Sequence, residues 1–252
     1  MNKRGSGIKI KTVFRIYRNG PGAVPTYCKL QSLIGNVSST TFIYGGSRAW
    51  TSSSDLLALD RMTSAEDIGN ADYKSATSIY DFTVLDIDGN QVSLEKYRNH
   101  VCIIVNVASK CGYTHVNYTQ LVDLYDRFES KGLKILAFPC NQFMSQEPGT
   151  SEEIKCFISG YKGDGKFDVF SKINVNGEDA HPLWKYLKEK QGGLLIDAIK
   201  WNFTKFVINK QGQPVERSAA NVNPFDMEKT IVKKLSSEIG DLYCRDASYV
   251  GC

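Results

Sequence analysis

The feature that most constrains the fold is the stretch of residues 101–139, in which two apolar runs enclose an amphipathic segment. Residues 101–107 are rich in β-branched side chains, as a buried strand is, and residues 133–139 have the same character. From Val116 to Ser130, apolar residues recur at spacings of three and four, which predicts a helix that ends before Gly132. Strand, helix and strand in this order predict a βαβ unit with parallel pairing of its two strands.

Shorter patterns on either side of this unit predict the remaining elements. They are a β-hairpin over residues 82–94, helices over 151–160 and 181–190, an antiparallel hairpin over 203–215 and a final helix over 226–235. Asp88-Gly89 is the turn signal of the first hairpin. Ser151, followed by two glutamates, is the expected N-terminal cap of the second helix.

Cys111 lies in the turn between the first central strand and its helix. A thiol at the first turn of a helix faces unpaired backbone N–H groups and the positive end of the dipole, and both stabilise a thiolate. Three residues later the chain has Thr114, so the turn lacks the second cysteine that dithiol exchange needs. A single activated thiolate suits attack on a peroxide oxygen, which would give a sulfenic acid. The alternative is an ordinary buried cysteine, since free cysteines are often buried.

Five segments together resemble the glutathione peroxidase family, and most closely its phospholipid-hydroperoxide branch: NVASKCGYT, VNYTQLVDLYDRF, ILAFPCNQFMSQEPG, NGEDAHPLWKYL and IKWNFTKFVINKQGQPVER. The resemblance covers roughly residues 75–235. It implies a thioredoxin-like fold of the α/β class, with a central mixed β-sheet flanked by helices. It also implies an enzyme that reduces lipid and organic hydroperoxides, and hydrogen peroxide, to alcohols with glutathione as the electron donor.

The resemblance assigns catalytic roles to four positions. In the family the attacking residue is selenocysteine or cysteine, and this position corresponds to Cys111. The family surrounds it with neutral donors, which correspond to Gln146, Trp201 and Asn202. An indole N–H and side-chain amides stabilise a thiolate without titrating themselves. Taken one at a time, Gln146 and Asn202 could be loop residues and Trp201 a core aromatic, but together they occur in the order of the family.

Basic residues are expected near the sulfur, because glutathione carries two carboxylates. By resemblance, Lys200 and Arg217 match positive positions of the lipid-directed branch. Tyr113 replaces a base often found just after the attacking residue, and Lys110 is a candidate to compensate. The resemblance implies no metal and no bound organic cofactor, so glutathione or a protein thiol acts as a co-substrate.

Two other functions stay open at this point. Family members that use thioredoxin carry a resolving cysteine at the position of Ser159, where this chain has none. A thioredoxin-dependent peroxidase would therefore need Cys156, Cys244 or Cys252 as its resolver. A peroxide sensor or relay would instead pass a disulfide from oxidised Cys111 to a partner protein.

Charge divides the chain near residue 55. Residues 1–54 hold eight Lys or Arg and no Asp or Glu, whereas the other 198 residues hold 23 basic and 27 acidic residues. An acid-free basic start without a long apolar run is typical of a mitochondrial transit peptide, and a cytosolic extension is the alternative. We predict an extension over residues 1–70, a peroxidase domain over 75–236 and a tail over 237–252. The expected location is mitochondrial or cytoplasmic rather than secreted.

The segment over residues 191–200, before Trp201, is short. The tetrameric branch of the family carries a longer insertion here, so the resemblance implies a monomer with an open site. Apolar residues 194–196 beside two basic positions suit transient contact with a membrane surface, unless they pack back onto the sheet. No run approaches the ~18 apolar residues of a membrane span. Nucleic acid is not an expected partner, because the basic residues of the N-terminus are spread out.

Overall fold

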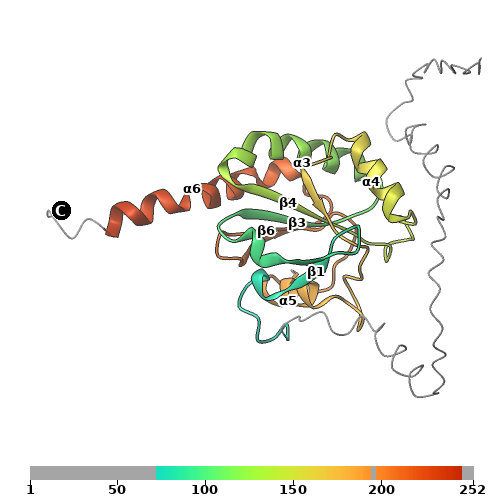
Figure 1. Ribbon diagram of the computed structural model, residues 1–252, viewed down its shortest axis with the longest axis horizontal. Helices are drawn as coiled ribbons and strands as arrows, with labels where there is room; N and C mark the ends of the chain where they lie inside the picture. Colours follow the sequence, from blue (N-terminus) through green and yellow to red (C-terminus); the bar gives the residue numbers. More distant parts are fainter. Residues whose placement is uncertain (1–71, 194–196, 246–252) are drawn as a thin grey trace, which may run out of the picture.

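The fold is built on a five-stranded sheet in the order β5-β4-β3-β6-β7. A computed structural model describes residues 72–193 and 197–245, with side chains described as far as residue 237 (Figure 1). β3 pairs in parallel with β4, and β4 with β5, whereas β6 pairs antiparallel with β3 and with β7. The elements are η1 Ile79–Asp81, β1 Thr83–Leu85, β2 Gln91–Ser93, η2 Leu94–Tyr97, β3 Val101–Val107, α3 Thr114–Phe128, η3 Glu129–Lys131, β4 Leu133–Pro139, α4 Ser151–Gly160, β5 Phe167–Val169, α5 Pro182–Lys190, β6 Lys205–Ile208, β7 Pro214–Ser218, η4 Pro224–Met227 and α6 Glu228–Arg245.

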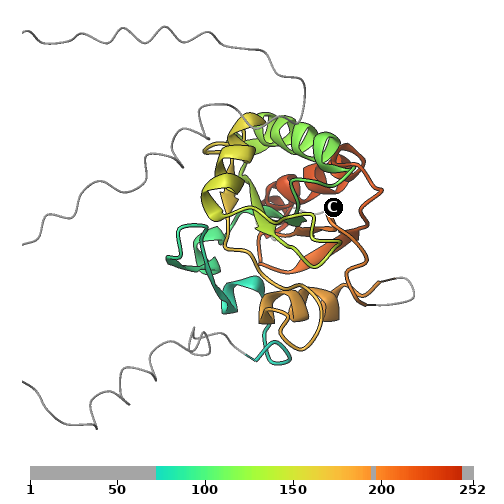
Figure 2. The same cartoon turned by 90° about the vertical axis from the view of Figure 1, so that its right-hand side faces the viewer.

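Helices cover both faces of this sheet. Figures 1 and 2 show α3, α4 and α6 over one face and α5 over the other. On the first face, Leu121 of α3, Ile154 of α4 and Ile231 of α6 belong to one buried cluster. On the second face, Trp184 of α5 and Phe138 of β4 belong to the other. The arrangement confirms the predicted thioredoxin-like α/β fold with a mixed central sheet.

The central strand β3 is buried along its whole length. Its odd-numbered residues join the cluster under α3, and Cys102 and Ile104 join the cluster over α5, because side chains alternate between the faces of a strand. Asn106 is the polar exception within the strand and is fully buried. A buried amide needs hydrogen-bond partners, and those of Asn106 lie at the candidate site described below.

Most predicted elements are confirmed, including the βαβ unit, both hairpins and the helix that His181 caps. The strand β5 was not predicted, because its three residues are too few for an alternating pattern. Thr150, not Ser151, caps α4: its side chain accepts from the N–H of Glu153 at 3.3 Å, and the Glu153 carboxylate accepts from the N–H of Thr150 at 2.9 Å. This reciprocal pair is a capping box, and its first residue lies one position before the expected cap, Ser151.

The last helix is longer than predicted. It was expected to end at Leu235, but α6 continues to Arg245, inside the segment assigned to a tail. In the sequence, Ile239 and Leu242 extend the three- and four-residue spacing of its apolar positions, so the periodic pattern continues beyond Leu235. The expected N-terminal extension, residues 194–196 and residues 246–252 lie outside the described residues.

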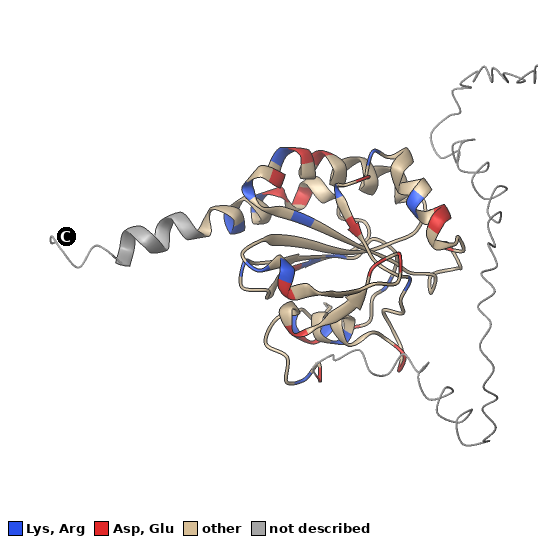
Figure 3. Ribbon diagram, viewed as in Figure 1, with Lys and Arg blue, Asp and Glu red and all other residues tan. Residues whose placement is uncertain are grey.

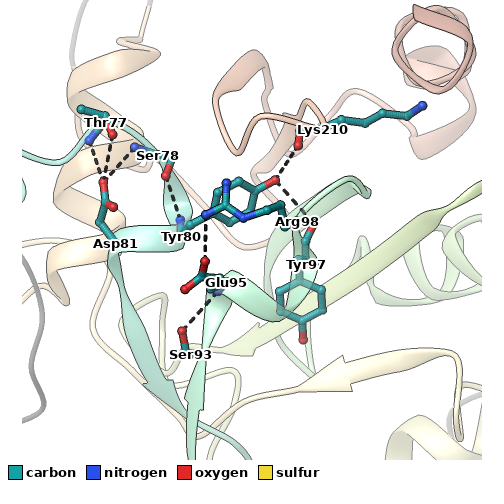
Figure 4. A network of polar contacts seen from close by, with 9 residues as sticks. All are labelled: Thr77, Ser78, Tyr80, Asp81, Ser93, Glu95, Tyr97, Arg98 and Lys210. Atoms are coloured by element: carbon teal, nitrogen blue, oxygen red, sulfur yellow. Dashed lines mark hydrogen bonds and ion pairs between the residues drawn. The ribbon is translucent and has the colours of Figure 1, made fainter. Parts of the chain in front are cut away.

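A polar network fastens the first described segment to the β6–β7 turn (Figure 4). The Tyr80 hydroxyl donates to the carbonyl oxygen of Lys210 at 2.7 Å, and the Arg98 guanidinium lies 4.6 Å from the centre of the Tyr80 ring. Gly212 in this turn has a φ of +80°, and a Cβ atom there would lie 2.7 Å from the Tyr80 ring. The turn therefore requires glycine both for its backbone and for the close approach of Tyr80.

Charges of both signs are interspersed over the described surface, as the blue and red segments of α3 and α4 show in Figure 3. Within the described ranges, no helix has the length and apolar character needed to cross a membrane. The same residues contain no group of three or more His, Cys, Asp or Glu placed to hold a metal ion.

Candidate active site

Cys111 lies between β3 and α3, as predicted, and its side chain is 8% exposed. Thr114 shapes this segment, since its Oγ1 accepts from the N–H of Cys111 at 3.1 Å and donates to the carbonyl oxygen of Ala108 at 2.7 Å. Residues 108–113 are named the Cys111 turn below. The N–H groups of Gly112 and Tyr113 have no acceptor among the described residues. These two groups precede the first turn of α3, where the helix dipole also favours an anion.

Trp201 and Asn202 lie in the segment over residues 201–204, named the donor turn, directly before β6. Asn106 of β3 holds this turn with both ends of its side chain: Nδ2 donates to the Trp201 carbonyl at 3.2 Å, and Oδ1 accepts from the Thr204 N–H at 2.9 Å. The Asn106 carbonyl also accepts from the N–H of Phe203 at 2.7 Å. Phe203 has a φ of +62°, a conformation that bulky residues rarely adopt without support.

Gln146 connects the two turns from the loop after β4. Its Oε1 accepts from Asn202 Nδ2 at 2.9 Å, and its backbone carbonyl accepts from the N–H of Lys110 at 3.0 Å. Because Oε1 is engaged by Asn202, Nε2 is the end of Gln146 that can donate to the sulfur. The structure thus brings the four predicted catalytic residues into one neighbourhood. Within its described part, no hydrogen bond reaches Cys111 Sγ, so the stabilising roles of Gln146 and Trp201 stay predictions.

The loop that carries Gln146 has an unusual backbone. Met144 and Ser145, the two residues before it, have φ values of +52° and +51°. Met144 is 78% exposed, whereas Phe143 is buried with its ring centre 5.9 Å from that of Trp201. Two consecutive left-handed residues cost free energy, and such strain persists where the surrounding structure imposes it. The anchored Phe143 is part of that support.

A hollow of about 710 Å³ opens beside the two turns. It is lined by Tyr113, Gly192, Gly193, Lys200, Trp201, Thr204, Arg217, Ala219, Ala220 and Asn221. The exposed Lys200 and the half-buried Arg217 therefore border the hollow, while their role in receiving an anionic thiol stays a prediction. The exposed Lys110 is not among the lining residues, and neither is Cys111.

Arg217 also has a structural task that the sequence did not reveal. Its two terminal nitrogens donate to the carbonyl oxygens of Gln191, Asp197 and Ala198, at 3.2, 2.9 and 2.9 Å. Burial lowers the pKa of this guanidinium. Arg217 thus holds the segment before Trp201 in place, and any contact with a bound carboxylate competes with these three carbonyls.

Sequence reasoning missed a buried carboxylate next to Gln146. Glu147 is fully buried, its Oε1 accepts from the Ser109 hydroxyl at 2.7 Å, and its N–H donates to Asn141 Oδ1 at 2.9 Å. Burial raises the pKa of the Glu147 carboxyl. The contact with Ser109 ties the loop of Gln146 to the Cys111 turn. The only signal in the sequence is an acidic residue beside the predicted glutamine.

The remaining cysteines of the described core lie in different surroundings. Cys102 and Cys140 are free and fully buried, and burial raises the pKa of both thiols. Cys156 is buried in α4. At the position expected for a resolving cysteine, the Ser159 hydroxyl shares its hydrogen between the Lys155 carbonyl, at 3.0 Å, and the carboxylate of Asp164, which lies beyond the end of α4, at 2.5 Å.

Comparisons with known proteins identify the family. A family model described as glutathione peroxidase matches residues 79–188. A phospholipid hydroperoxide glutathione peroxidase of Pongo pygmaeus is 57% identical over 162 residues, which cover 64% of this chain and 81% of that protein. A glutathione peroxidase of Schistosoma mansoni is 53% identical over 169 residues, covering 67% and 99%. The chain belongs to the glutathione peroxidase family.

A solved structure is also similar. The crystal structure of Trgpx in apo form has 38% sequence identity and a TM-score of 0.52, and the match covers 64% of this chain and 97% of that one. These relationships confirm the resemblance found in the sequence. The chain is a peroxidase with a thioredoxin-like fold, while the roles of its individual residues stay predictions.

Proposed function

We propose that this member of the glutathione peroxidase family reduces phospholipid and other organic hydroperoxides, and hydrogen peroxide, with glutathione as its electron donor. The observation that carries the proposal is the joining of the Cys111 turn to the donor turn through Gln146, beside a hollow that reaches the surface. The name of the relative from Pongo pygmaeus supports phospholipid hydroperoxides as the substrate class.

In the oxidative half of the reaction, the Cys111 thiolate attacks the distal oxygen of the hydroperoxide. The S–O bond forms as the O–O bond breaks, and Cys111 becomes a sulfenic acid. The departing alkoxide takes a proton from solvent and leaves as the alcohol. Side-chain N–H donors of Gln146 and Trp201, with the N–H groups of Gly112 and Tyr113, stabilise the thiolate before the attack.

In the reductive half, a first glutathione thiol attacks the sulfur of the sulfenic acid. Water leaves and a mixed disulfide forms between glutathione and Cys111. A second glutathione attacks the sulfur of the bound glutathione, which gives glutathione disulfide and returns Cys111 to the thiol. The exposed ammonium of Lys200 at the hollow is placed to attract a carboxylate of the incoming thiol.

Mass spectrometry of the full chain tests this sequence of states. After one equivalent of hydroperoxide we expect the gain of one oxygen on Cys111, and with glutathione present we expect the mixed disulfide at the same residue. Turnover is then measured with excess glutathione and with excess thioredoxin. An internal disulfide with turnover only in thioredoxin would contradict the glutathione assignment. A mixed disulfide with a protein and negligible turnover would contradict an enzymatic role for this chain.

The oligomeric state and the membrane contact are part of the same proposal. The short segment before Trp201 supports a monomer, and the apolar residues 194–196 beside Lys200 support contact with a lipid surface. Analytical ultracentrifugation should give a monomer, and Leu195→Glu should lower turnover of a phospholipid hydroperoxide in mixed micelles more than turnover of hydrogen peroxide. A stable tetramer without phospholipid turnover would contradict both statements.

The location of the protein is proposed from the charge of its N-terminus. The acid-free, basic residues 1–54 support import into mitochondria, followed by removal of the extension. A fluorescent fusion of residues 1–60 should enter mitochondria. A fusion that stays in the cytosol or follows the secretory route would contradict this assignment.

A further inference from the structure

Lys205 is a fully buried lysine that the reaction described above does not use. It is the first residue of β6, lies opposite Val105 of the central strand and has a relative exposure of 0%. Burial lowers the pKa of its side chain to about 7, and Asp226 partly opposes this shift. A buried amine is costly unless its hydrogens are bonded, so its partners indicate what it does.

The first partner belongs to the donor turn. Lys205 Nζ donates to the carbonyl oxygen of Phe203 at 2.7 Å. Phe203 is the residue with a φ of +62°, and it directly follows Trp201 and Asn202. Its N–H is held by Asn106, so Lys205 secures the other end of the same strained residue. A left-handed aromatic residue persists only where its surroundings impose it.

The second partner leads to the Cys111 turn. Lys205 Nζ also donates to Asn117 Oδ1 at 3.0 Å, and Asn117 Nδ2 donates to the carbonyl oxygen of Tyr113 at 2.9 Å. Tyr113 lies two residues after Cys111, precedes the first residue of α3 and lines the hollow. One amine is thus bonded, directly and through one amide, to the two segments that meet at the candidate active site.

We propose that Lys205 is a positioning residue for the peroxide reaction, which holds the donor turn and the Cys111 turn in register with each other. The inference rests on the proposed function, because it assigns the lysine a task in the attack of Cys111 on a peroxide. Lys205 acts through Phe203 and Asn117 and does not touch the substrate. Two hydrogens suffice for its two acceptors, so the protonated and the neutral amine both perform this task.

A purely structural lysine would have a different kinetic signature. Attack on a peroxide needs the sulfur and the donors of Gln146 and Trp201 in one geometry, whereas alkylation by iodoacetamide needs only an accessible thiolate. Displacement of one turn against the other by about 1 Å is expected to slow the geometry-dependent reaction by up to about 100-fold. The ratio of the two rate constants for Cys111 therefore reports positioning rather than folding.

The experiment measures both rate constants on the full chain, with tert-butyl hydroperoxide and with iodoacetamide at the same pH. Lys205→Met should lower the ratio of peroxide rate to alkylation rate by about 10- to 100-fold. Asn117→Asp keeps the acceptor for Lys205 but removes the donor to Tyr113, and it should lower the ratio in the same direction. Val207→Ala is the matched control, because Val207 is buried two residues further along β6 and takes no part in these contacts.

The outcomes separate this inference from the proposed function. A wild-type chain that does not react with the hydroperoxide contradicts the proposed function itself. A reactive wild type with an unchanged ratio in Lys205→Met overturns the inference alone, and so does an equal loss in Val207→Ala. If Lys205→Met does not fold, an unchanged ratio in Asn117→Asp overturns it. The double variant Lys205→Met with Trp201→Phe gives a further test. The inference is supported if the ratio falls by less than the product of the two single reductions, because coupled sites are not additive.

Discussion

The Cys111 turn and the donor turn meet at one site but are held in opposite ways. Thr114 closes the Cys111 turn on itself, through contacts with Cys111 and Ala108 that span three and six residues. Asn106 closes the donor turn from 95 residues away in the sequence. Local contacts therefore shape the backbone at Cys111, although Lys110 and Ser109 also bond to the loop of Gln146, whereas the donor turn depends mainly on Asn106. Loss of the Asn106 contacts should displace the donors more than the cysteine.

The largest effect is expected from removing the predicted nucleophile, Cys111, from the Cys111 turn. Cys111→Ser should reduce reaction with hydroperoxide below detection without unfolding the domain, because serine has no accessible anion at neutral pH. Cys140→Ser is the control, since Cys140 is a free cysteine whose pKa is raised by burial. Stopped-flow measurement of peroxide consumption checks both variants. Equal losses of peroxide consumption in the two variants would mean that Cys111 does not differ from an ordinary buried cysteine.

A smaller effect is expected on the side held by tertiary contacts. Gln146→Ala or Trp201→Phe should each slow the oxidative step by roughly 10- to 1000-fold, by analogy with the loss of one oxyanion-hole donor. Trp184→Phe is a matched control, because Trp184 is fully buried in α5 and its indole nitrogen has no partner among the described residues. Unchanged rates of sulfenic acid formation in these two variants would mean that Gln146 and Trp201 contribute only to packing.

The comparison itself is tested by one variant in each turn. Asn106→Leu leaves the Thr204 N–H unpaired and removes one of the two donors to the Trp201 carbonyl, so it should lower the free energy of unfolding by about 2–4 kcal/mol. Thr114→Val removes one hydroxyl with two local contacts and should cost about 1–2 kcal/mol. Urea unfolding measures both. The comparison between the turns is contradicted if Thr114→Val lowers the free energy of unfolding more than Asn106→Leu does and also breaks the contact between the two turns.

A pH dependence of stability is expected from Lys205, the buried amine that bonds to the donor turn. The pKa of Lys205 is about 7 in the folded protein and 10.5 for an ordinary lysine, so the unfolded chain binds more protons between these values. Stability should therefore rise with pH above 7, by up to about 1.4 kcal/mol per pH unit, and this contribution is lost as the pH falls through 7. Unfolding free energies from pH 7 to 9 should rise less in Lys205→Met than in the wild type. If the curves of unfolding free energy against pH are parallel for the wild type and Lys205→Met, the assignment of this pH dependence to Lys205 is contradicted.

The same contrast explains which parts of the molecule the sequence could predict. The strands β3 and β4 and the helix α3 follow from local periodicity, and the place of Cys111 follows from them. The fold class and the three donors came instead from the resemblance to a family, since no local pattern brings Gln146 to Asn202. Local pattern also placed the helix α5, but its cap is a finding of the structure: His181 Nδ1 accepts from the N–H of Leu183 at 3.2 Å.

Three residues whose contacts could not be predicted share one physical cause. Asn106, Glu147 and Lys205 are polar residues in buried positions, and each has at least one partner far away in the sequence. Periodicity reports whether a residue is apolar but not which distant group will satisfy a buried amide, carboxylate or amine. The strand β5 was missed for a simpler reason, because three residues carry too little pattern.

The exposed methionine before Gln146 affects how the chemistry can be observed. Met144 lies two residues from a predicted donor and is 78% exposed, so a hydroperoxide in solution reaches its thioether. Its sulfoxide adds one oxygen to the chain, as the sulfenic acid of Cys111 does, and the two products have the same intact mass. Thiols remove the oxygen of the cysteine but leave that of the methionine, which needs a dedicated reductase. The full chain has four methionines, so a Met144→Leu background removes only one of these sources, and peptide-level analysis is the condition under which one added oxygen reports on Cys111 alone.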